Sequence, residues 1–389
     1  MSRFDEVRNR RNTQSLKWHV SERELPMWVA DMDFQAAPEI REALQKRVEH
    51  GIFGYPSLPD EWFEAYIGWW KQRHAFVMKQ KWLLFCIGII PAIASVVRHL
   101  TAEDERVIVI SPTYNHFFNC IENNGREAVE SRLICQNGTY EIDWQDLEEK
   151  CRDPKNTLLL FCNPQNPTGT IWDKETIARV GEICRENRVI VVSDEIHCDI
   201  TVPGKDYIPF ASVSDSCREN SITCMAPTKT FNIAGIQTAA VCVPDPELRK
   251  RVREAFVLDE TGEGNVFACD AAIAAYTYGA GWLDELRSYL AKNRETAENY
   301  ICEKIPEIRV IPAEATYLMW LDCTRVGIPS DKLRILLREK TGLVLSEGGI
   351  YRGDGKYFMR MNIACPRATL EDGLVRLEKG IREVLPETQ

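Results

Sequence analysis

The sequence lacks an excess of positive charge, and it lacks any long apolar run. Its 58 acidic and 48 basic side chains give a formal net charge of −10 at pH 7. Proteins that bind nucleic acids displace counterions with a basic surface, so we expect no nucleic-acid partner. No apolar run approaches the ~20 residues that a helix needs to span a bilayer, and the first residues lack the apolar core of a signal peptide. We therefore expect no membrane association and a cytoplasmic location.

The cysteines lack the spacing of a disulfide framework or a metal site. Fourteen are present, scattered singly and never as a C-x-x-C pair, and the six histidines do not cluster with them. Many stand inside apolar runs, as Cys162 and Cys242 do. Free thiols that serve as small apolar side chains in a reducing compartment explain this pattern best. We therefore predict no metal site.

The pattern of apolar runs predicts the first and larger part of the fold. With 389 residues, 44% of them hydrophobic, the chain can form about two domains. From residue 106 onwards, continuous apolar runs end in polar loops and alternate with helical periodicity. The runs that we interpret as strands are 107–110, 158–162, 189–192 and 221–224, with a helix at 174–187. Strands that are apolar on both faces and separated by helices predict an α/β fold with a mostly parallel sheet, covered on both sides.

The last third of the sequence predicts a second, smaller unit. Helical patterning runs from residue 269 to residue 305, and strands alternate with helices after it. The expected strands are 309–311, 317–321 and 358–363, and the expected helices are 330–340 and 370–384. No Gly/Ser-rich linker separates the two parts, so we expect an α+β domain that packs closely on the first.

Residues 25–34 form an irregular segment that is neither amphipathic nor alternating. Asp31 and Asp33 stand there among apolar and aromatic residues, which suits either a carboxylate dyad or a structured arm folded over the body. A helix is expected to begin near Pro38. Its apolar residues at helical spacing, which we expect on one buried face, are Ile40, Leu44 and Val48.

One lysine stands in a turn of small and hydroxyl-bearing residues between two apolar runs. Lys229 lies within Met225–Asn232, after the run 221–224 and before the run 238–243. Burial there would disfavour its ammonium form, which is how a lysine becomes a nucleophile for carbonyl carbons. Taken alone, the segment fits a loop lysine beside a core strand better, and only the other stretches that fit the same chemistry reverse this preference.

Other polar residues at the ends of the predicted strands fit the same chemistry. Ligands of parallel α/β sheets bind beyond the carboxyl ends of the strands, where these side chains are expected. An aldehyde-bearing pyridinium phosphate needs a lysine for its aldehyde, a carboxylate for its ring nitrogen, a donor for its phenolic oxygen and a platform for its ring. The aldehyde can react with Lys229, the ring nitrogen can pair with Asp194, the phenolic oxygen can accept from Asn166, and the ring can stack on Tyr114. The phosphate can be bound by Thr228 and the turn Gly88–Ala92. Asp194 alone fits a helix cap or a strand-end acid as well.

Three segments resemble the signature blocks of the class I and II pyridoxal-phosphate aminotransferases of fold type I. They are Asn163–Gly169, Ser193–His197 and Ala226–Gly235. Three more segments resemble one branch of that family, the carbon–sulfur lyases of the cystathionine β-lyase type; they are Met27–Phe34, Phe53–Pro56 and Arg360–Arg367. The resemblance covers nearly the whole chain. It implies a large domain with a mostly parallel sheet of the seven-stranded type between helices and a smaller α+β domain. The implied boundaries are an arm at 1–45 joining the small domain, the large domain at 46–285 and the small domain at 286–389.

The resemblance also implies roles for individual residues. Lys229 would form the Schiff base with pyridoxal 5'-phosphate and act as the general base. The other cofactor contacts would be Ile89, Ile90, Tyr114, Asn166, Asp194, His197 and Thr228. Arg360 would bind the substrate carboxylate, a task that suits a guanidinium, with Asn166 and Ala30 as further substrate contacts. Tyr55 would reach the phosphate of the neighbouring subunit, which implies a homodimer with shared active sites. Arg367 fits a structural ion pair as well as a site role.

Two departures from the transaminase pattern weaken a strict transaminase interpretation, although neither excludes a Schiff base. His197 stands where many aminotransferases have a tyrosine, and Gln237 stands where they have a phosphate-binding arginine. We therefore expect a carbon–sulfur β-lyase that converts L-cystathionine or S-substituted L-cysteines to a thiol, pyruvate and ammonia. The alternatives are an aminotransferase that uses the same residues and, more distantly, a non-catalytic module that binds the cofactor for regulation.

Overall fold

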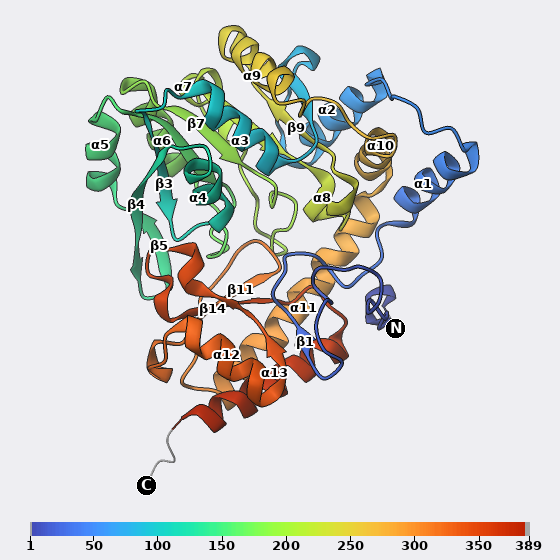
Figure 1. Cartoon of the computed structure of the whole chain (residues 1–389), viewed down its shortest axis with the longest axis vertical. Coiled ribbons are helices and arrows are strands. Elements are labelled where there is room, and N and C mark those ends of the chain that lie inside the picture. The colour runs from blue at the N-terminus through green and yellow to red at the C-terminus, as the bar shows by residue number, and fades with distance from the viewer. Residues whose placement is uncertain (1, 386–389) are drawn as a thin grey trace.

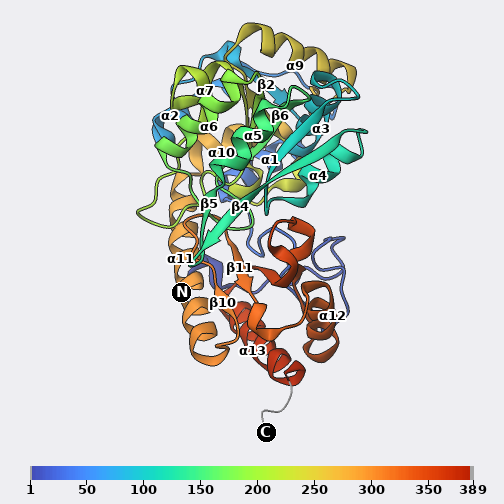
Figure 2. The ribbon, with the colours of Figure 1, turned by 90° about the vertical axis from the view of Figure 1, so that its left-hand side faces the viewer.

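The computed structural model describes residues 2–385 and shows two parts, one built around a large sheet and one around a small sheet (Figure 1). The helix α11 (Ala280–Lys304) runs from the first part into the second. The N-terminal segment lies beside the second part, as does the last helix, α13 (Arg367–Val384) (Figure 2). Within the described residues, no helix combines the length and apolar character that crossing a membrane requires.

The large sheet has eight strands in the order β2-β9-β8-β7-β6-β3-β4-β5. They are β2 (Leu83–Cys86), β3 (Arg106–Ser111), β4 (Glu127–Gln136), β5 (Thr139–Ile142), β6 (Asn156–Cys162), β7 (Ile190–Asp194), β8 (Ser221–Met225) and β9 (Ala239–Cys242). The five strands from β8 to β4 run parallel, whereas β9 is antiparallel to both of its neighbours. The mostly parallel sheet is therefore confirmed. Its eighth strand, β5, returns along β4 through Asn137 and Gly138, both at positive φ, as a two-residue hairpin requires.

The central strands are buried on both faces because successive side chains enter two separate apolar clusters. In β3, Val107 and Val109 pack on one side of the sheet, and Ile108 and Ile110 pack on the other. The first side is covered by α3 (Ile89–Leu100), α4 (Asn115–Glu122) and α9 (Pro246–Leu258). The second is covered by α5 (Trp144–Arg152), α6 (Lys174–Glu186) and α7 (Asp215–Glu219). These side chains are tightly packed, and truncating one of them would leave a cavity that costs about 2–5 kcal/mol of unfolding free energy. The packed strands therefore form a rigid base for the loops at their ends.

The second part contains a four-stranded antiparallel sheet in the order β10-β11-β14-β13. Its strands are β10 (Arg309–Val310), β11 (Leu318–Asp322), β13 (Ser346–Glu347) and β14 (Phe358–Asn362). The helices α11, α12 (Ser330–Thr341) and α13 pack with it. The short strand β1 (Leu25–Pro26) pairs in parallel with β12 (Leu343–Val344), so the N-terminal segment is tied to the second part of the molecule. The elements expected after residue 309 are confirmed.

Three helices pack beside the large sheet at its β2 end: α1 (Pro38–His50), α2 (Asp60–His74) and α10 (Ala268–Tyr278). α2 buries Trp62, Tyr66 and Trp70. In α1, Ile40 is fully buried but Val48 is 51% exposed, so the prediction of one buried face was wrong for its last turn. In the same turn Arg47 pairs with Asp270 of α10 at 2.6 Å, so this turn contacts α10 through a charged side chain.

Candidate active site

The candidate residues converge because several parallel strands end at the same edge of the large sheet. The last residue of β7, Asp194, pairs in register with Cys162 of β6 and Cys224 of β8. The loop Asn163–Gly169 follows β6, and the short helix α8 (Pro227–Thr230) follows β8. Polar residues just beyond the carboxyl ends of parallel strands are placed to bind a ligand.

Lys229 lies in α8, with its side chain half-buried. Its Nζ donates a hydrogen bond to the carbonyl oxygen of Ala30 at 2.6 Å. Burial, and after it the charge of Arg360, lower the pKa of Lys229 to about 8 against the opposing charges of Asp31 and Asp194. A lysine with this pKa is available as a neutral nucleophile and base near neutral pH.

Asp194 is a buried carboxylate whose Oδ1 accepts the backbone N–H of Ile196 at 3.1 Å. Burial raises the pKa of Asp194 to about 6, while the bond from Ile196 and the charge of Lys229 act to lower it. One backbone N–H does not offset the cost of burying this negative charge, so a cationic N–H partner would stabilise the carboxylate. The next residue, Glu195, contributes elsewhere: it accepts from Ser193 at 2.8 Å and from the backbone of Phe210 at 2.9 Å.

Arg360, on β14, brings the second sheet to this site. Its Nη1 donates to Asn166 Oδ1 at 3.1 Å, its Nη2 donates to the Trp28 carbonyl at 3.1 Å, and the guanidinium lies 4.9 Å from the ring centre of Tyr351. Among the described residues, its buried Nε has no hydrogen-bond partner. That free N–H suits a carboxylate acceptor, and the amide nitrogen of Asn166 remains as a donor.

A glycine fixes the loop that carries Asn166 against the second part of the molecule. Gly169 has a φ of +73°, and a side chain there would collide with Ala313 and the carbonyl of Ala315. The Gly169 carbonyl accepts the backbone N–H groups of Glu314 and Ala315 at 2.9 and 3.0 Å. The close approach explains why this loop requires glycine at its end.

His197 and Tyr317 stand next to each other beside Lys229. His197 is 3% exposed, and burial lowers its pKa to about 3, helped by the charges of Lys229 and Arg360, so the imidazole is neutral. Its Nδ1 has no partner among the described residues. Tyr317, whose ring centre lies 6.2 Å from that of His197, donates to the Ala30 carbonyl at 3.1 Å. Tyr317 was missed in the sequence analysis, because its run was interpreted only as a strand.

The residues expected to bind a phosphate lie at two helix starts. Gly88 caps α3, so the N–H groups of Ile89 and Ile90 fall in its first turn, where backbone donors have no helical acceptor. Thr228 is buried in the first turn of α8, next to Lys229. Tyr114 follows β3, half-buried, and burial raises the pKa of its hydroxyl to about 12. Gln237, which stands where many aminotransferases have a phosphate-binding arginine, is exposed at the end of a short turn.

Two of the expected residues are not brought to this site within the single chain. Tyr55 is fully exposed and lies on a surface groove with Leu58 and Phe85. Arg367 is the first residue of α13, and its backbone N–H donates to the Tyr289 hydroxyl at 2.8 Å, away from the candidate site. Among the ion pairs of residues 2–385, none involves the Arg367 guanidinium, so the structural ion pair that we considered is absent there.

One group of potential metal ligands forms a hydrogen-bond cluster instead. His74, Cys198 and Asp199 approach one another within 4.8 Å. The Asp199 carboxylate already accepts from Trp69 Nε1 at 2.9 Å, His74 Nε2 at 2.9 Å and Thr230 Oγ1 at 2.9 Å. These bonds satisfy the buried carboxylate and fix the end of α8, so the cluster supports the position of the neighbouring lysine.

Comparison with known proteins agrees with this geometry. The family described as "Aminotransferase class I and II" matches residues 26–377. The chain belongs to the class I and II aminotransferase family. It is 40% identical to the cystathionine beta-lyase PatB of Bacillus subtilis over 97% of this chain and 99% of that protein.

Solved structures of this family have the same fold. Cystalysin from Treponema denticola, which contains a pyridoxal 5'-phosphate cofactor, matches with a TM-score of 0.94 and 31% identity over 98% of each chain. The pyridoxal-phosphate-bound C-S lyase from Staphylococcus hominis matches with a TM-score of 0.91 and 30% identity over 98% of each chain. The fold-type and family resemblance inferred from the sequence is therefore confirmed.

Proposed function

We propose that this family member is a pyridoxal 5'-phosphate-dependent carbon–sulfur β-lyase that converts L-cystathionine or S-substituted L-cysteines to a thiol, pyruvate and ammonia. The observation that carries the proposal is the convergence of three groups at one sheet edge: a lysine of lowered pKa, a buried carboxylate and a guanidinium with a free N–H. The relatives named as lyases supply the reaction class.

The residues present fit the cofactor. Lys229 is a nucleophilic amine for its aldehyde, and the poorly compensated carboxylate of Asp194 suits its protonated ring nitrogen. Asn166 retains an amide donor for the ring oxygen, and Tyr114 offers an aromatic face. Thr228 and the backbone N–H groups of Ile89 and Ile90 suit the phosphate. His197, next to Tyr317 and Lys229, is available as a neutral donor or acceptor for the cofactor. When bound, the cofactor supplies a protonated ring that withdraws electrons from the Cα–H bond of an attached amino acid.

The protein's own residues then bind, orient and move protons. Arg360 holds the α-carboxylate through its free N–H, and Asn166 and the Ala30 carbonyl line the same space. Lys229 takes the α-proton, since with a pKa of about 8 roughly a tenth of this side chain is neutral at pH 7. Removal of the α-proton leaves an electron pair that expels a thiolate from Cβ, and hydrolysis yields pyruvate and ammonia.

The same proposal includes a cytoplasmic homodimer with shared active sites. Apolar side chains are exposed around Tyr55 and on neighbouring helices, including Val48, Ile52, Phe53 and Tyr278. An exposed apolar patch of this kind supports a contact with a second copy, in which Tyr55 reaches the partner's phosphate site. The domain boundaries that we propose remain residues 1–45, 46–285 and 286–389.

A series of S-substituted cysteines tests the reaction class. The purified protein should release thiol from each member, with a rate that rises as the pKa of the leaving thiol falls, because departure of the thiolate follows proton removal. Thiol release is measured with a chromogenic disulfide, and L-alanine, which has no leaving group, is the matched control. Absence of thiol release from every member of the series would contradict the proposal.

A further inference from the structure

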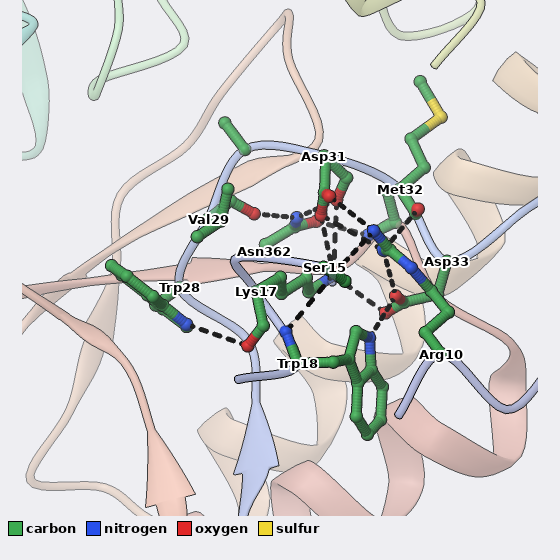
Figure 3. Close-up of polar contacts among 12 residues, drawn as sticks. Arg10, Ser15, Lys17, Trp18, Trp28, Val29, Asp31, Met32, Asp33 and Asn362 are labelled. Carbon is green, nitrogen blue, oxygen red and sulfur yellow. Dashed lines mark hydrogen bonds and ion pairs between the residues drawn. The ribbon is translucent and has the colours of Figure 1, made fainter. Parts of the chain in front are cut away.

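A cluster of ion pairs anchors the N-terminal arm inside the protein. The Asp33 carboxylate accepts from Arg10 Nη1 at 2.7 Å, from Lys17 Nζ at 2.7 Å and from Trp18 Nε1 at 2.8 Å (Figure 3). The Asp31 carboxylate accepts from Arg10 Nη2 at 2.7 Å. Both carboxylates are therefore engaged within the arm itself, which leaves its backbone carbonyls to contact the rest of the site.

One buried asparagine fixes the direction of these carbonyls. Asn362 is the last residue of β14, and its amide nitrogen donates to the Val29 carbonyl at 2.7 Å and to the Asp31 carbonyl at 2.6 Å. Figure 3 shows the amide between these two carbonyls. Its amide oxygen accepts the backbone N–H of Ala364 at 2.7 Å, which holds the side chain in place. The Asn362 amide therefore binds the residue before and the residue after Ala30.

The carbonyl of Ala30, between these two, accepts two donors of the candidate site. Lys229 Nζ donates to it at 2.6 Å, and the hydroxyl of the buried Tyr317 donates to it at 3.1 Å. A carbonyl oxygen has two lone pairs and can accept both bonds at once. The backbone oxygen that binds the Lys229 amine is thus held by Tyr317 directly and by Asn362 through its two neighbours in the chain.

We propose that Asn362 and Tyr317 are positioning residues that orient the Ala30 carbonyl, so that this oxygen holds the Lys229 amine in place for transfer of the α-proton. The role rests on the proposed function, in which Lys229 takes that proton. A free lysine amine moves on a flexible four-carbon stem, and an acceptor of fixed direction restricts that movement before the transfer. Asn362 and Tyr317 act through this backbone oxygen.

Two substitutions loosen the Ala30 carbonyl by different routes. Asn362→Leu nearly keeps the size of the side chain and removes both N–H donors to the arm. Tyr317→Phe keeps the ring and removes only the hydroxyl that binds Ala30, so it remains informative if the first variant does not fold. Arg338→Gln is the matched control, because it removes a side chain that binds the arm elsewhere, through Glu24 at 2.7 Å. Thermal unfolding checks the fold of each variant.

The first measurement uses the full-length chain freed of cofactor and follows hydrogen exchange by mass spectrometry in peptides that cover residues 27–34. The backbone N–H groups of Met32 and Asp33 are hydrogen-bonded, so their exchange reports how firmly the arm is held. Asn362→Leu removes two hydrogen bonds to the arm and should speed this exchange on the order of tenfold. Arg338→Gln should leave it within about twofold of the parent. Unchanged exchange in Asn362→Leu would overturn the inference.

The second measurement follows the α-proton in the holoenzyme, with L-alanine in heavy water and the rate expressed per bound cofactor. Lys229 removes the α-hydrogen, exchanges its N–H with the solvent and returns a deuteron, so NMR records the transfer without cleavage at Cβ. Asn362→Leu should slow this exchange by about tenfold to a hundredfold. Tyr317→Phe should slow it by roughly twofold to tenfold, and Arg338→Gln should not slow it. An α-proton exchange equal to that of the parent in both site variants would overturn the inference.

An isotope effect separates this role from a merely structural one. Under the proposed function, departure of the thiolate controls the rate, so α-deuteration of an S-substituted cysteine should have a small effect on kcat in the parent. A misplaced Lys229 slows proton transfer relative to that departure, and the isotope effect should rise in Asn362→Leu. A lower kcat with the isotope effect of the parent would mean only a loss of active protein and would refute the role.

The two proposals fail separately. A chain that exchanges the α-proton of L-alanine, and does so more slowly in Asn362→Leu, but cleaves no carbon–sulfur bond would refute the function alone. An active lyase in which the arm and the α-proton exchange alike in the parent and in both site variants would refute the positioning role alone.

Discussion

Replacing Arg360 with alanine tests the substrate-binding geometry most fully. The guanidinium is 5% exposed, and its Nε has no partner among the described residues, so a substrate carboxylate bound there is largely desolvated. Truncating one partner of such a pair costs about 2–5 kcal/mol. Since about 1.4 kcal/mol corresponds to tenfold, kcat/KM should fall by roughly 30-fold to several thousand-fold. Both parameters should change, because the carboxylate also orients Cα toward Lys229.

The same variant should shift the pH profile in a defined direction. The charge of Arg360 helps to hold the pKa of Lys229 down at about 8, so its removal raises that pKa. Lys229 must be neutral to act as a base, and the acid limb of kcat should therefore move to higher pH. The assay couples pyruvate to lactate dehydrogenase across pH 6 to 10. Arg367→Gln, seven residues further along the chain and beside Tyr289, is the control and should stay within about twofold. A kcat/KM within threefold of the parent, or an unmoved acid limb, would refute the reasoning.

Three further predictions follow from individual residues. Lys229→Ala should lose turnover by at least ~10²–10⁴-fold, and borohydride should no longer fix the cofactor to the chain; near-normal activity would contradict the role of this lysine. If Tyr55 acts across a dimer, mixing Lys229→Ala with Tyr55→Phe subunits creates one intact site per heterodimer, and activity should exceed that of either parent; a strictly monomeric active protein in sedimentation would exclude this. Burial raises the pKa of Glu195 from 4.5 to about 8, so above about pH 4.5 the unfolded chain releases a proton that the folded protein retains. Stability should therefore fall as pH rises from about 4.5 to about 8, by on the order of a few kcal/mol, and Glu195→Gln should flatten this dependence in urea unfolding at pH 5 and pH 8.

The sequence predicted the part of the site that depends on strand ends. Asp194 and the loop that carries Asn166 directly follow continuous apolar runs, and such runs in a parallel sheet end at one edge. The contact of Arg360 with Asn166 was not predictable from spacing, because it joins residues 194 positions apart, one on β14 and the other in the loop after β6. The resemblance to a family supplied the role of Arg360, and the structure supplies its neighbours.

The arm shows why the remaining features escaped prediction. The sequence left open whether Asp31 and Asp33 form a dyad or belong to a structured arm. Their partners Arg10 and Lys17 lie in an irregular segment without periodicity, so nothing in the pattern pairs them with these acids. Tyr317 enters the site through its hydroxyl although its neighbours form an ordinary buried strand. Val48 fits a helical apolar face, but burial depends on what packs against that face, and Val48 itself stays 51% exposed although Arg47 in the same turn pairs with Asp270 of α10.

The most direct test of the central claim is the product balance from L-cystathionine in the absence of any keto acid. The account predicts equal amounts of pyruvate, ammonia and homocysteine, because proton removal by Lys229 leads to loss of the thiolate from Cβ. It also predicts slow or no reaction of alanine or aspartate with 2-oxoglutarate under the same conditions. Rapid amino transfer to 2-oxoglutarate, with no pyruvate from cystathionine, would contradict the lyase assignment and identify the protein as an aminotransferase.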